Sequence, residues 1–317
     1  MIRYFLHWAR TLTRYAVVIA TGVLFTGIGA PPVDAVEPPA RSVLVPQSQA
    51  PGRMEIRALA HAYPDRISET AFRDGEWALR IEDQWFYWAD GRLLPEHQRF
   101  NSADFTGLRF YNYTTGPLVF RAVDSQTAER LRQRNRGGAT PPPTRYNGFL
   151  DALYGIAVRS DGYQLIVTTR LFGLQTQVHR MIVEPLQSVE REVLAIARHD
   201  AEVRSFLDEL HQVSGFVWRN IAGTSSRSYH SYGIAVDLIP RSYQRRFGYW
   251  RWALDSGIED WWDLPLEQRW SVPQPVIDSF ERNGFIWGGK WLSFDPIHFE
   301  YRPEVLILAR WRDAGLL

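Results

Sequence analysis

A single acidic residue inside an apolar strand constrains this chain more than any other feature. Asp237 interrupts the apolar run IAVDLI at 234–239. A carboxylate in such a strand is costly to bury unless a cation or hydrogen-bond donors compensate its charge. Because side chains alternate along a strand, Asp237 shares a face with the small residues Gly233 and Ala235, while the larger apolar residues face a core. The pattern predicts that Asp237 meets a metal ion or a buried cation across this small-residue face.

Two histidines in the same half of the chain can complete a metal site. His230 lies seven residues before Asp237, in the turn that leads into the strand, and His298 lies in the strand-like stretch FDPIHFEY at 294–301. A catalytic zinc ion has three nitrogen or oxygen ligands from the protein and one open position. An H-x6-D pair and a histidine in a strand are each common by chance. Their combination predicts a zinc site.

Two motifs in this half resemble those of a known family of zinc peptidases. The stretch SYHSYGIAVDL at 228–238 is similar to the S-x-H-x-x-G-x-A-x-D motif of the VanY-type D-Ala-D-Ala carboxypeptidases and the related L-alanyl-D-glutamate endopeptidases. The stretch GFIWGGKWLSFDPIHFE at 284–300 resembles the second motif of the endopeptidase branch, which ends in D-x-x-H-F-E. The resemblance covers roughly residues 186–317. It implies a peptidoglycan-cleaving zinc enzyme with a fold related to the lysostaphin-type and hedgehog-type folds.

The resemblance also implies the central roles at the site. Carried over position by position, it makes His230, Asp237 and His298 the zinc ligands. Asp295, three residues before the second histidine, becomes the general base. Glu300 is the rival base, because in an extended strand it shares a face with His298; its other role is to support the ligands.

Further residues are implied with less defined roles. Arg219, in the preceding WRN, matches a family arginine near the scissile carbonyl, where a guanidinium suits developing negative charge. A salt bridge at a strand end is the alternative role for Arg219. Ser228, Tyr232 and Trp287 are expected to bind substrate or to support the site by hydrogen bonding and packing.

The N-terminal segment has the layout of an export signal. Three arginines precede the apolar run at 15–30, and small residues follow it, so residues 1–35 are typical of a secretory signal cleaved after Ala35. An uncleaved N-terminal anchor is the alternative, because the run approaches the length that spans a bilayer. Either predicts a location outside the cytoplasm, periplasmic or associated with the cell wall, with membrane attachment only if the signal is retained. The Pro-, Ser- and Gln-rich residues 36–52 indicate a linker.

In the chain that follows the linker, the first half has the sequence pattern of β-strands. Residues 53–180 combine many aromatic residues with three hairpin signals, at Asp90-Gly91, at Thr115–Pro117 and at Asp161-Gly162. No catalytic constellation is visible here. We therefore expect a β-rich region of unknown role, and a wall-binding function for it stays open.

The second half mixes helix and strand signals. Helices are expected from about Pro185, after an N-cap at Asp200, at Pro275–Asn283 and from Pro303, with strands from Gly215, around Asp237 and in the two motif segments. Without a strict βαβ rhythm, this predicts an α+β fold. Residues 181–317 would form a zinc metallopeptidase domain with a small antiparallel sheet flanked by helices. The Trp-rich residues 243–272 either cap the groove or pack against the first half.

The amino-acid composition excludes several classes of site and function. With no cysteine, the chain has no disulfide, no thiolate nucleophile and no Cys-type zinc site. The 36 Lys and Arg residues balance the 35 Asp and Glu residues, so nothing indicates nucleic-acid binding. The prediction is a monomeric zinc peptidase that hydrolyses stem-peptide bonds of peptidoglycan. The alternative is a non-catalytic cell-wall-binding module that keeps the zinc-peptidase fold; the presence of Asp295 favours the enzyme.

Overall fold

The computed structural model of this chain describes residues 47, 50–120, 122–136 and 143–316. The described residues belong to one compact unit. The expected signal at 1–35 and most of the expected linker at 36–52 lie outside the described residues. No helix in the described part has the length and hydropathy needed to cross a membrane.

The first part of the unit contains a meandering sheet, a hairpin and several short helices. The strands of the sheet, which are antiparallel and neighbour one another in chain order, are β1 (Ile67–Arg73), β2 (Glu76–Ile81), β3 (Gln84–Tyr87) and β4 (Leu94–Pro95). The hairpin consists of β5 (Ile166–Leu171) and β6 (Leu174–His179). The helices of this part are α1 (Arg53–Ala62), the 3₁₀ helix Glu96–Asp104, α2 (Ser125–Asn135), α3 (Gly148–Tyr154) and α4 (Gly162–Leu165).

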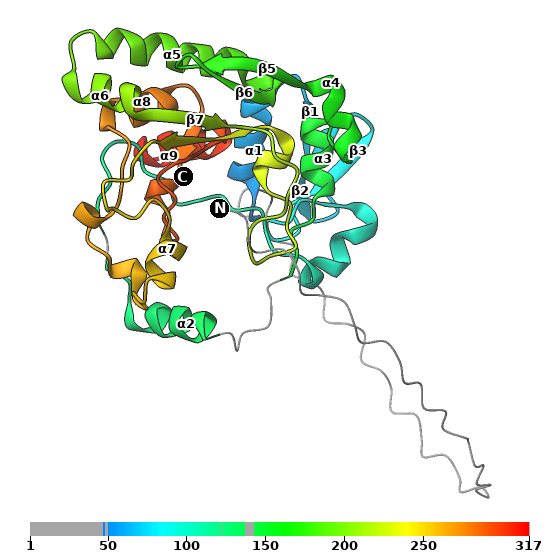
Figure 1. Cartoon of the computed structure of the whole chain (residues 1–317). Coiled ribbons are helices and arrows are strands. Elements are labelled where there is room, and N and C mark those ends of the chain that lie inside the picture. Colours follow the sequence, from blue (N-terminus) through cyan, green and yellow to red (C-terminus); the bar gives the residue numbers. More distant parts are fainter. Residues whose placement is uncertain (1–46, 48–49, 121, 137–142, 317) are drawn as a thin grey trace, which may run out of the picture. The chain divides into compact units, whose positions relative to one another are not determined.

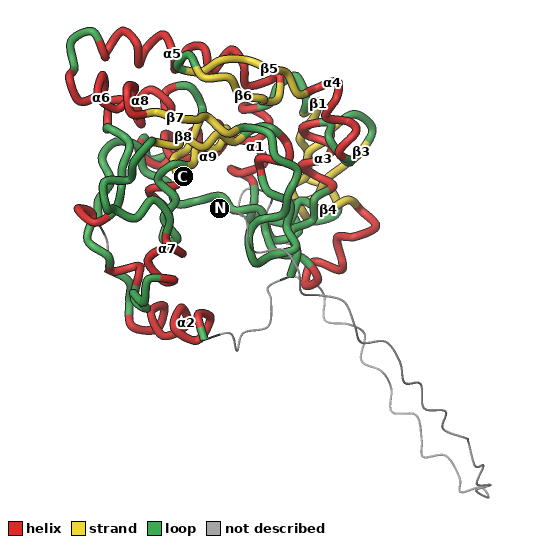
Figure 2. Tube along the Cα trace, viewed as in Figure 1, coloured by secondary structure: helices red, strands yellow, loops and turns green. Residues whose placement is uncertain are grey.

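The second part is built on a small antiparallel sheet. Its strands lie in the order β7-β8-β10-β9 and are β7 (Leu210–Ser214), β8 (Ala235–Pro240), β10 (His298–Tyr301) and β9 (Phe285–Trp287). Its helices are α5 (Val183–Ala197), α6 (Ala201–Glu209), α7 (Trp250–Asp255), α8 (Gln274–Arg282) and α9 (Pro303–Asp313). Figure 1 shows these elements, and Figure 2 shows that loops make up most of the chain between β7 and β8 and around α7. Mixed helices and small antiparallel sheets confirm the α+β class.

The register of β8 and β10 separates a core face from a polar face. His298 pairs with Asp237, and Phe299 pairs with Val236. Val236 and Phe299 are fully buried, and the ring of Phe299 stacks on Phe280 of α8 at 4.0 Å. Asp237 and His298 therefore point together to the opposite face, as the alternation of the sequence predicts.

Two helix boundaries lie where capping signals predict them. The carboxylate of Asp200 accepts hydrogen bonds from the backbone N–H groups of Glu202 and Val203, at 2.9 and 3.0 Å, and so caps the start of α6. Gly284, with a φ of 92°, follows α8 in the left-handed conformation that ends many helices.

Two of the three expected hairpins are wrong. The turn at Asp90-Gly91 does connect the paired strands β3 and β4. The segment around Thr115–Pro117 has no flanking strands; it is a loop held by Tyr113, whose hydroxyl donates to Glu281. At Asp161 the carboxylate accepts from two preceding backbone N–H groups and the chain enters α4, so the hairpin β5–β6 turns later, at Phe172-Gly173.

The strand expected from Gly215 is also displaced. Strand β7 ends at Ser214, and the N–H of Phe216 donates to the carbonyl of Gln177 in β6 at 2.6 Å. A Cβ at Gly215 would lie 2.1 Å from that same carbonyl oxygen. The close approach of β6 thus draws the chain out of the sheet at the glycine.

Residues 53–180 are not a separate β-rich region. They contain helices α1 to α4 as well as six strands. Buried side chains from both sides of residue 181, such as Phe149 and Val189, belong to one hydrophobic core. The helix α1 packs against α9 (Figure 1), and the N–H of His179 in β6 donates to Gly233 beside the second sheet. The apolar side chains of residues 53–180 and those of the following residues therefore bury one another.

A buried arginine connects these halves. Arg302 is 1% exposed; its guanidinium pairs with Glu304 and donates to the Tyr229 hydroxyl and to the carbonyl of Arg109, both at 2.9 Å. Glu304 also accepts a hydrogen bond from the hydroxyl of Tyr63, which follows α1. This network joins α1, α9 and the loop at Arg109.

Replacing this arginine is expected to destabilise the protein. Arg302→Met leaves the buried Glu304 carboxylate without its partner, which costs about 3–5 kcal/mol. Urea unfolding followed by circular dichroism measures the change. Arg310→Met, an exposed position on α9, is the matched control and should shift stability by less than about 0.5 kcal/mol. Equal stability of the two variants would contradict this role.

Candidate metal centre and groove

Local structure brings His230 over the end of β8. The residue lies in the short 3₁₀ helix Tyr229–Tyr232, where the Ser228 hydroxyl oxygen accepts a hydrogen bond from its N–H at 3.4 Å. Gly233 follows with a φ of 67°, and a Cβ there would lie 2.7 Å from the backbone nitrogen of His179. A glycine is therefore needed for the tight turn from this helix into β8.

Three side chains converge on the polar face of the sheet. Asp237 Oδ1 lies 2.7 Å from His298 Nδ1 and 3.2 Å from His230 Nε2, and the two nitrogens are 3.2 Å apart. His230 and His298 are 1% and 7% exposed. The three residues are close enough to hold one metal ion. The structure thus brings together the three residues that the motifs select.

The outer hydrogen bonds of the two histidines orient their rings. His230 Nδ1 lies 2.6 Å from the carbonyl oxygen of Gly215, and His298 Nε2 lies 3.1 Å from Glu300 Oε1. With an N–H directed to each of these acceptors, the inner nitrogens, Nε2 of His230 and Nδ1 of His298, face Asp237 and offer lone pairs to a metal ion when the rings are neutral. Two imidazole lone pairs and a carboxylate oxygen in contact form a donor set for a cation, and this set fits zinc.

The electrostatics of the cluster also favour a positive charge. Burial by itself would lower the pKa of His298, but hydrogen bonds to Asp237 and Glu300 outweigh it and hold that pKa well above its usual value. Burial would raise the pKa of Asp237, yet the two histidines hold it below its ordinary range. A cation placed among these groups compensates the half-buried carboxylate of Asp237 and the buried carboxylate of Glu300.

A groove of about 390 Å³ opens onto the cluster. Asp237, His298, Asp295 and Arg219 are among the residues that line it. Arg219 is exposed and has no carboxylate within ion-pair distance in the described part of the chain. The alternative role of Arg219, a salt bridge at a strand end, is therefore not formed among these residues.

Asp295 has the properties of a proton-transfer group. Its Oδ1 is buried and has no hydrogen-bond partner in the described residues. Burial raises the pKa of Asp295 to about 7, and repulsion from Asp237 and Glu300 acts in the same direction, against attraction from His298 and Arg219. A carboxyl group with such a pKa at the edge of a groove can both accept and donate a proton near neutrality.

Not every residue selected from the sequence reaches the groove. Ser228 and Glu300 line it, but Tyr232 and Trp287 do not. The Tyr232 hydroxyl is turned away and donates to Asp151 at 2.7 Å. Trp287 pairs with Phe299 in the sheet, so its ring lies on the core face, where it is 2% exposed. Of the two roles expected for Tyr232 and Trp287, substrate contact or support by hydrogen bonding and packing, their positions agree with the second.

The first half of the chain contributes to the groove, which the sequence did not predict. Residues at 106–111 and 143–145 line the groove, including Arg109 and Tyr111. The Tyr111 ring stacks on Trp291 at 5.3 Å, and the Trp291 ring lies 5.4 Å from that of His298. These residues come from loops without periodicity, and only the basic and aromatic letters RFYNY at 109–113 mark them in the sequence.

Residues 243–272 both cap the groove and pack against the first half of the chain, the two roles that the sequence left open. Tyr249 and Trp252 line the groove. Trp261 and Trp262 are buried against Ala128 and Leu131 of α2, which lies beside this segment in Figure 1.

Comparisons with known proteins agree with the geometry. Residues 222–301 match the family described as D-alanyl-D-alanine carboxypeptidase, and residues 55–109 match a family described as a domain of unknown function (DUF8518). No curated protein and no solved structure matches the chain. The first match contains His230, Asp237, Asp295, His298 and Glu300. It supports the peptidase family broadly, and with it a peptidoglycan-related hydrolase.

Proposed function

We propose that this protein is a zinc-dependent peptidase that hydrolyses peptide bonds in the stem peptides of peptidoglycan. One observation carries the proposal: Asp237 and His298 of the His-Asp-His donor set line the same groove as Asp295, whose Oδ1 has no hydrogen-bond partner in the described residues. The match of residues 222–301 to the D-alanyl-D-alanine carboxypeptidases supports the substrate class. A serine mechanism has less support, because the sequence lacks the G-x-S-x-G elbow.

In this mechanism His230, Asp237 and His298 hold the ion. Zinc, when bound, supplies Lewis acidity that lowers the pKa of water and polarises a carbonyl. The carboxylate of Asp295 takes a proton from the attacking water and returns it to the leaving amine, which its raised pKa permits. Arg219, exposed at the groove, binds the carbonyl oxygen or a substrate carboxylate. Ser228 holds the turn that carries His230.

Glu300 supports the site rather than acting as the base. One of its oxygens accepts from His298 Nε2, and the other lies 3.7 Å from Arg302. The first oxygen is therefore committed to orienting His298, whereas the second, Oε2, makes no hydrogen bond in the described residues and is held only by the ion pair with Arg302.

The Glu300→Gln variant is expected to bind zinc more weakly by about tenfold or more, because an amide holds the histidine N–H less strongly. Competition with a fluorescent zinc chelator measures the affinity. Glu202→Gln, an exposed acid-to-amide change on α6, should keep the wild-type value. An unchanged affinity in Glu300→Gln would rule out the orienting role.

The proposed substrate sets the proposed location and partners. Peptidoglycan lies outside the cytoplasmic membrane, so we infer that the protein acts there as a monomer on stem peptides. This agrees with the export signal expected at residues 1–35, and membrane attachment would follow only from a retained signal.

The test is to incubate the purified protein with intact peptidoglycan and identify products by mass spectrometry. Loss of a terminal D-Ala would identify a carboxypeptidase, and new L-Ala and D-Glu termini would identify an endopeptidase. If the zinc-loaded protein binds every wall preparation but cleaves none, the enzyme proposal fails and the protein is a binding module.

A further inference from the structure

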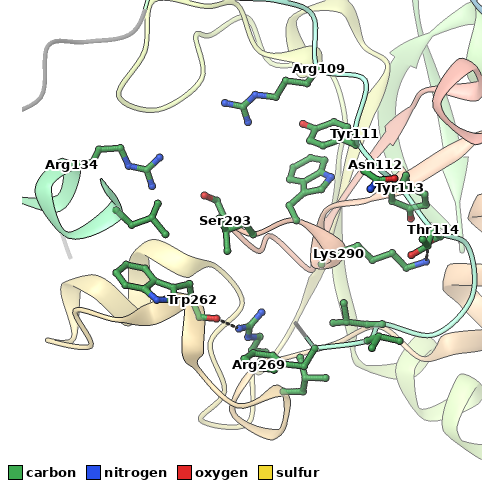
Figure 3. Close-up of a pocket in the computed structure, with 18 residues that line it drawn as sticks. Arg109, Tyr111, Asn112, Tyr113, Thr114, Arg134, Trp262, Arg269, Lys290 and Ser293 are labelled. Atoms are coloured by element: carbon green, nitrogen blue, oxygen red, sulfur yellow. Dashed lines mark hydrogen bonds between the residues drawn. The ribbon is translucent and has the colours of Figure 1, made fainter. Parts of the chain in front are cut away.

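A second cavity lies beside the catalytic groove. It has a volume of about 500 Å³ and is lined by the loop at 109–120, by α2, by the segment at 262–269 and by residues 289–293 (Figure 3). Arg109, Tyr111 and Trp291 line both this cavity and the groove. Most of its wall lies outside residues 222–301, the segment that matches the peptidase family.

Two of the four cations that line the cavity are already engaged. Lys290 pairs with Glu281 and donates to the carbonyl of Thr114. Arg269 is buried and donates to the carbonyls of Leu264 and Trp262, both at 3.0 Å. Figure 3 shows Lys290 directed to Thr114 and Arg269 directed to Trp262. They form part of the wall.

Arg109 and Arg134 are the other two cations that line the cavity, and their side chains are not engaged in this way in the described part of the chain. Both are exposed, and in Figure 3 their guanidinium groups extend into the cavity from two sides. In the described part of the chain, neither side chain has a hydrogen-bond acceptor or a carboxylate within ion-pair distance. Partial desolvation at the cavity wall lowers the pKa of Arg134, and repulsion from Arg109 and Arg251 lowers it further. An anion between these groups would relieve that repulsion.

The position of Arg134 is well supported. Its neighbour Arg132 forms a bidentate ion pair with Asp260, with hydrogen bonds of 2.9 and 2.8 Å. Leu131 is buried in the hydrophobic cluster that contains Trp262. These contacts hold α2 against the 260–262 segment. The guanidinium of Arg134, which lies 5.6 Å from the centroid of the Trp250 ring and has no carboxylate partner in the described residues, is thus presented by an anchored helix.

We propose that this cavity binds a free carboxylate on the part of the stem peptide that extends beyond the catalytic groove. Guanidinium groups bind carboxylates through paired hydrogen bonds, and the aromatic wall of Tyr111 and Trp291 provides an apolar surface for the rest of the ligand. The continuity of the cavity with the groove through Arg109 makes one peptide able to occupy both. This inference rests on the proposed function, since it extends the same substrate.

The test compares two forms of one soluble stem peptide, with its glutamate and side-chain carboxylates either free or amidated. Binding is measured by calorimetry in an Asp295→Asn background, which prevents turnover. The double variant R109Q/R134Q is expected to bind the free-carboxylate peptide at least about tenfold more weakly than its parent, because two charge-assisted contacts are lost. Binding of the amidated peptide should be weak and nearly equal in the two proteins. Arg130→Gln removes an exposed charge from the same helix outside the cavity and should leave the affinity for both peptides unchanged.

The outcomes separate this inference from the proposed function. If R109Q/R134Q binds the free-carboxylate peptide as well as its parent does, or if the parent binds neither peptide, the cavity inference is wrong, even if the wild type cleaves peptidoglycan. If carboxylate selectivity is present in the parent and lost in R109Q/R134Q, the inference holds. It then holds even if the wild type cleaves no wall preparation, in which case the proposed hydrolysis alone fails.

Discussion

Asp295→Asn is expected to lower the rate of peptidoglycan hydrolysis by about 10²–10⁴-fold, the usual contribution of a general acid–base group. The amide keeps the shape of the side chain but cannot take the proton of the attacking water. Because the side chain of Asp295 makes no hydrogen bond to the three ligand side chains, zinc content should remain that of the wild type. Product release followed by mass spectrometry and metal analysis of the same preparations measure both quantities.

The matched comparison is Glu300→Gln, which changes the rival carboxylate in the same way. At saturating zinc it should retain far more activity than Asp295→Asn, since its effect acts through zinc affinity. If Glu300→Gln is the inactive variant and Asp295→Asn remains active with zinc bound, the assignment of the base is reversed.

Asp237→Ala is expected to abolish both metal binding and hydrolysis. It removes the one oxygen ligand, which contacts both histidines, at 2.7 and 3.2 Å. Thermal unfolding with and without a chelator gives a readout that does not depend on activity. A ligand present at a thousand times its Kd stabilises a protein by about 4 kcal/mol, so chelation should lower the melting temperature of the zinc-loaded wild type by several degrees.

In Asp237→Ala the same chelator should leave the melting temperature unchanged, because no zinc is bound to remove. Asp255→Ala, at an exposed acidic position on α7, is the control and should respond to chelation as the wild type does. A zinc-dependent melting temperature in Asp237→Ala would show that the ion is held elsewhere.

The candidate metal ligands were accessible to sequence reasoning because their signals are local. Alternation along β8 separates Asp237 from its core-facing neighbours, and the order of the two motifs selects His230 and His298. The cap at Asp200 and the glycine at 284 are equally local. Each of these follows from the physics of one strand or one helix end, which few residues determine.

The features that could not be predicted from the sequence depend on tertiary contacts. Trp287 lies on the core face because β9 pairs with β10 in one particular register, and that register cannot be read from either strand alone. Arg109 and Tyr111 reach the groove because the loop that carries them is tied to Arg302, far along the sequence. The many aromatic residues at 53–180 are typical of strands, and they obscure the helix α1, which buries Ile56 and Leu59 with helical spacing.

We propose that one zinc ion, held by His230, Asp237 and His298, supports hydrolysis of peptidoglycan. The most direct measurement is a titration of chelator-treated protein with zinc, in which hydrolysis of purified peptidoglycan is recorded at each addition. We predict no hydrolysis without metal, then a linear rise in the rate as zinc is added, and a plateau at one zinc ion per chain. Full hydrolysis before any zinc is added, or none once zinc is bound at one per chain, would contradict it.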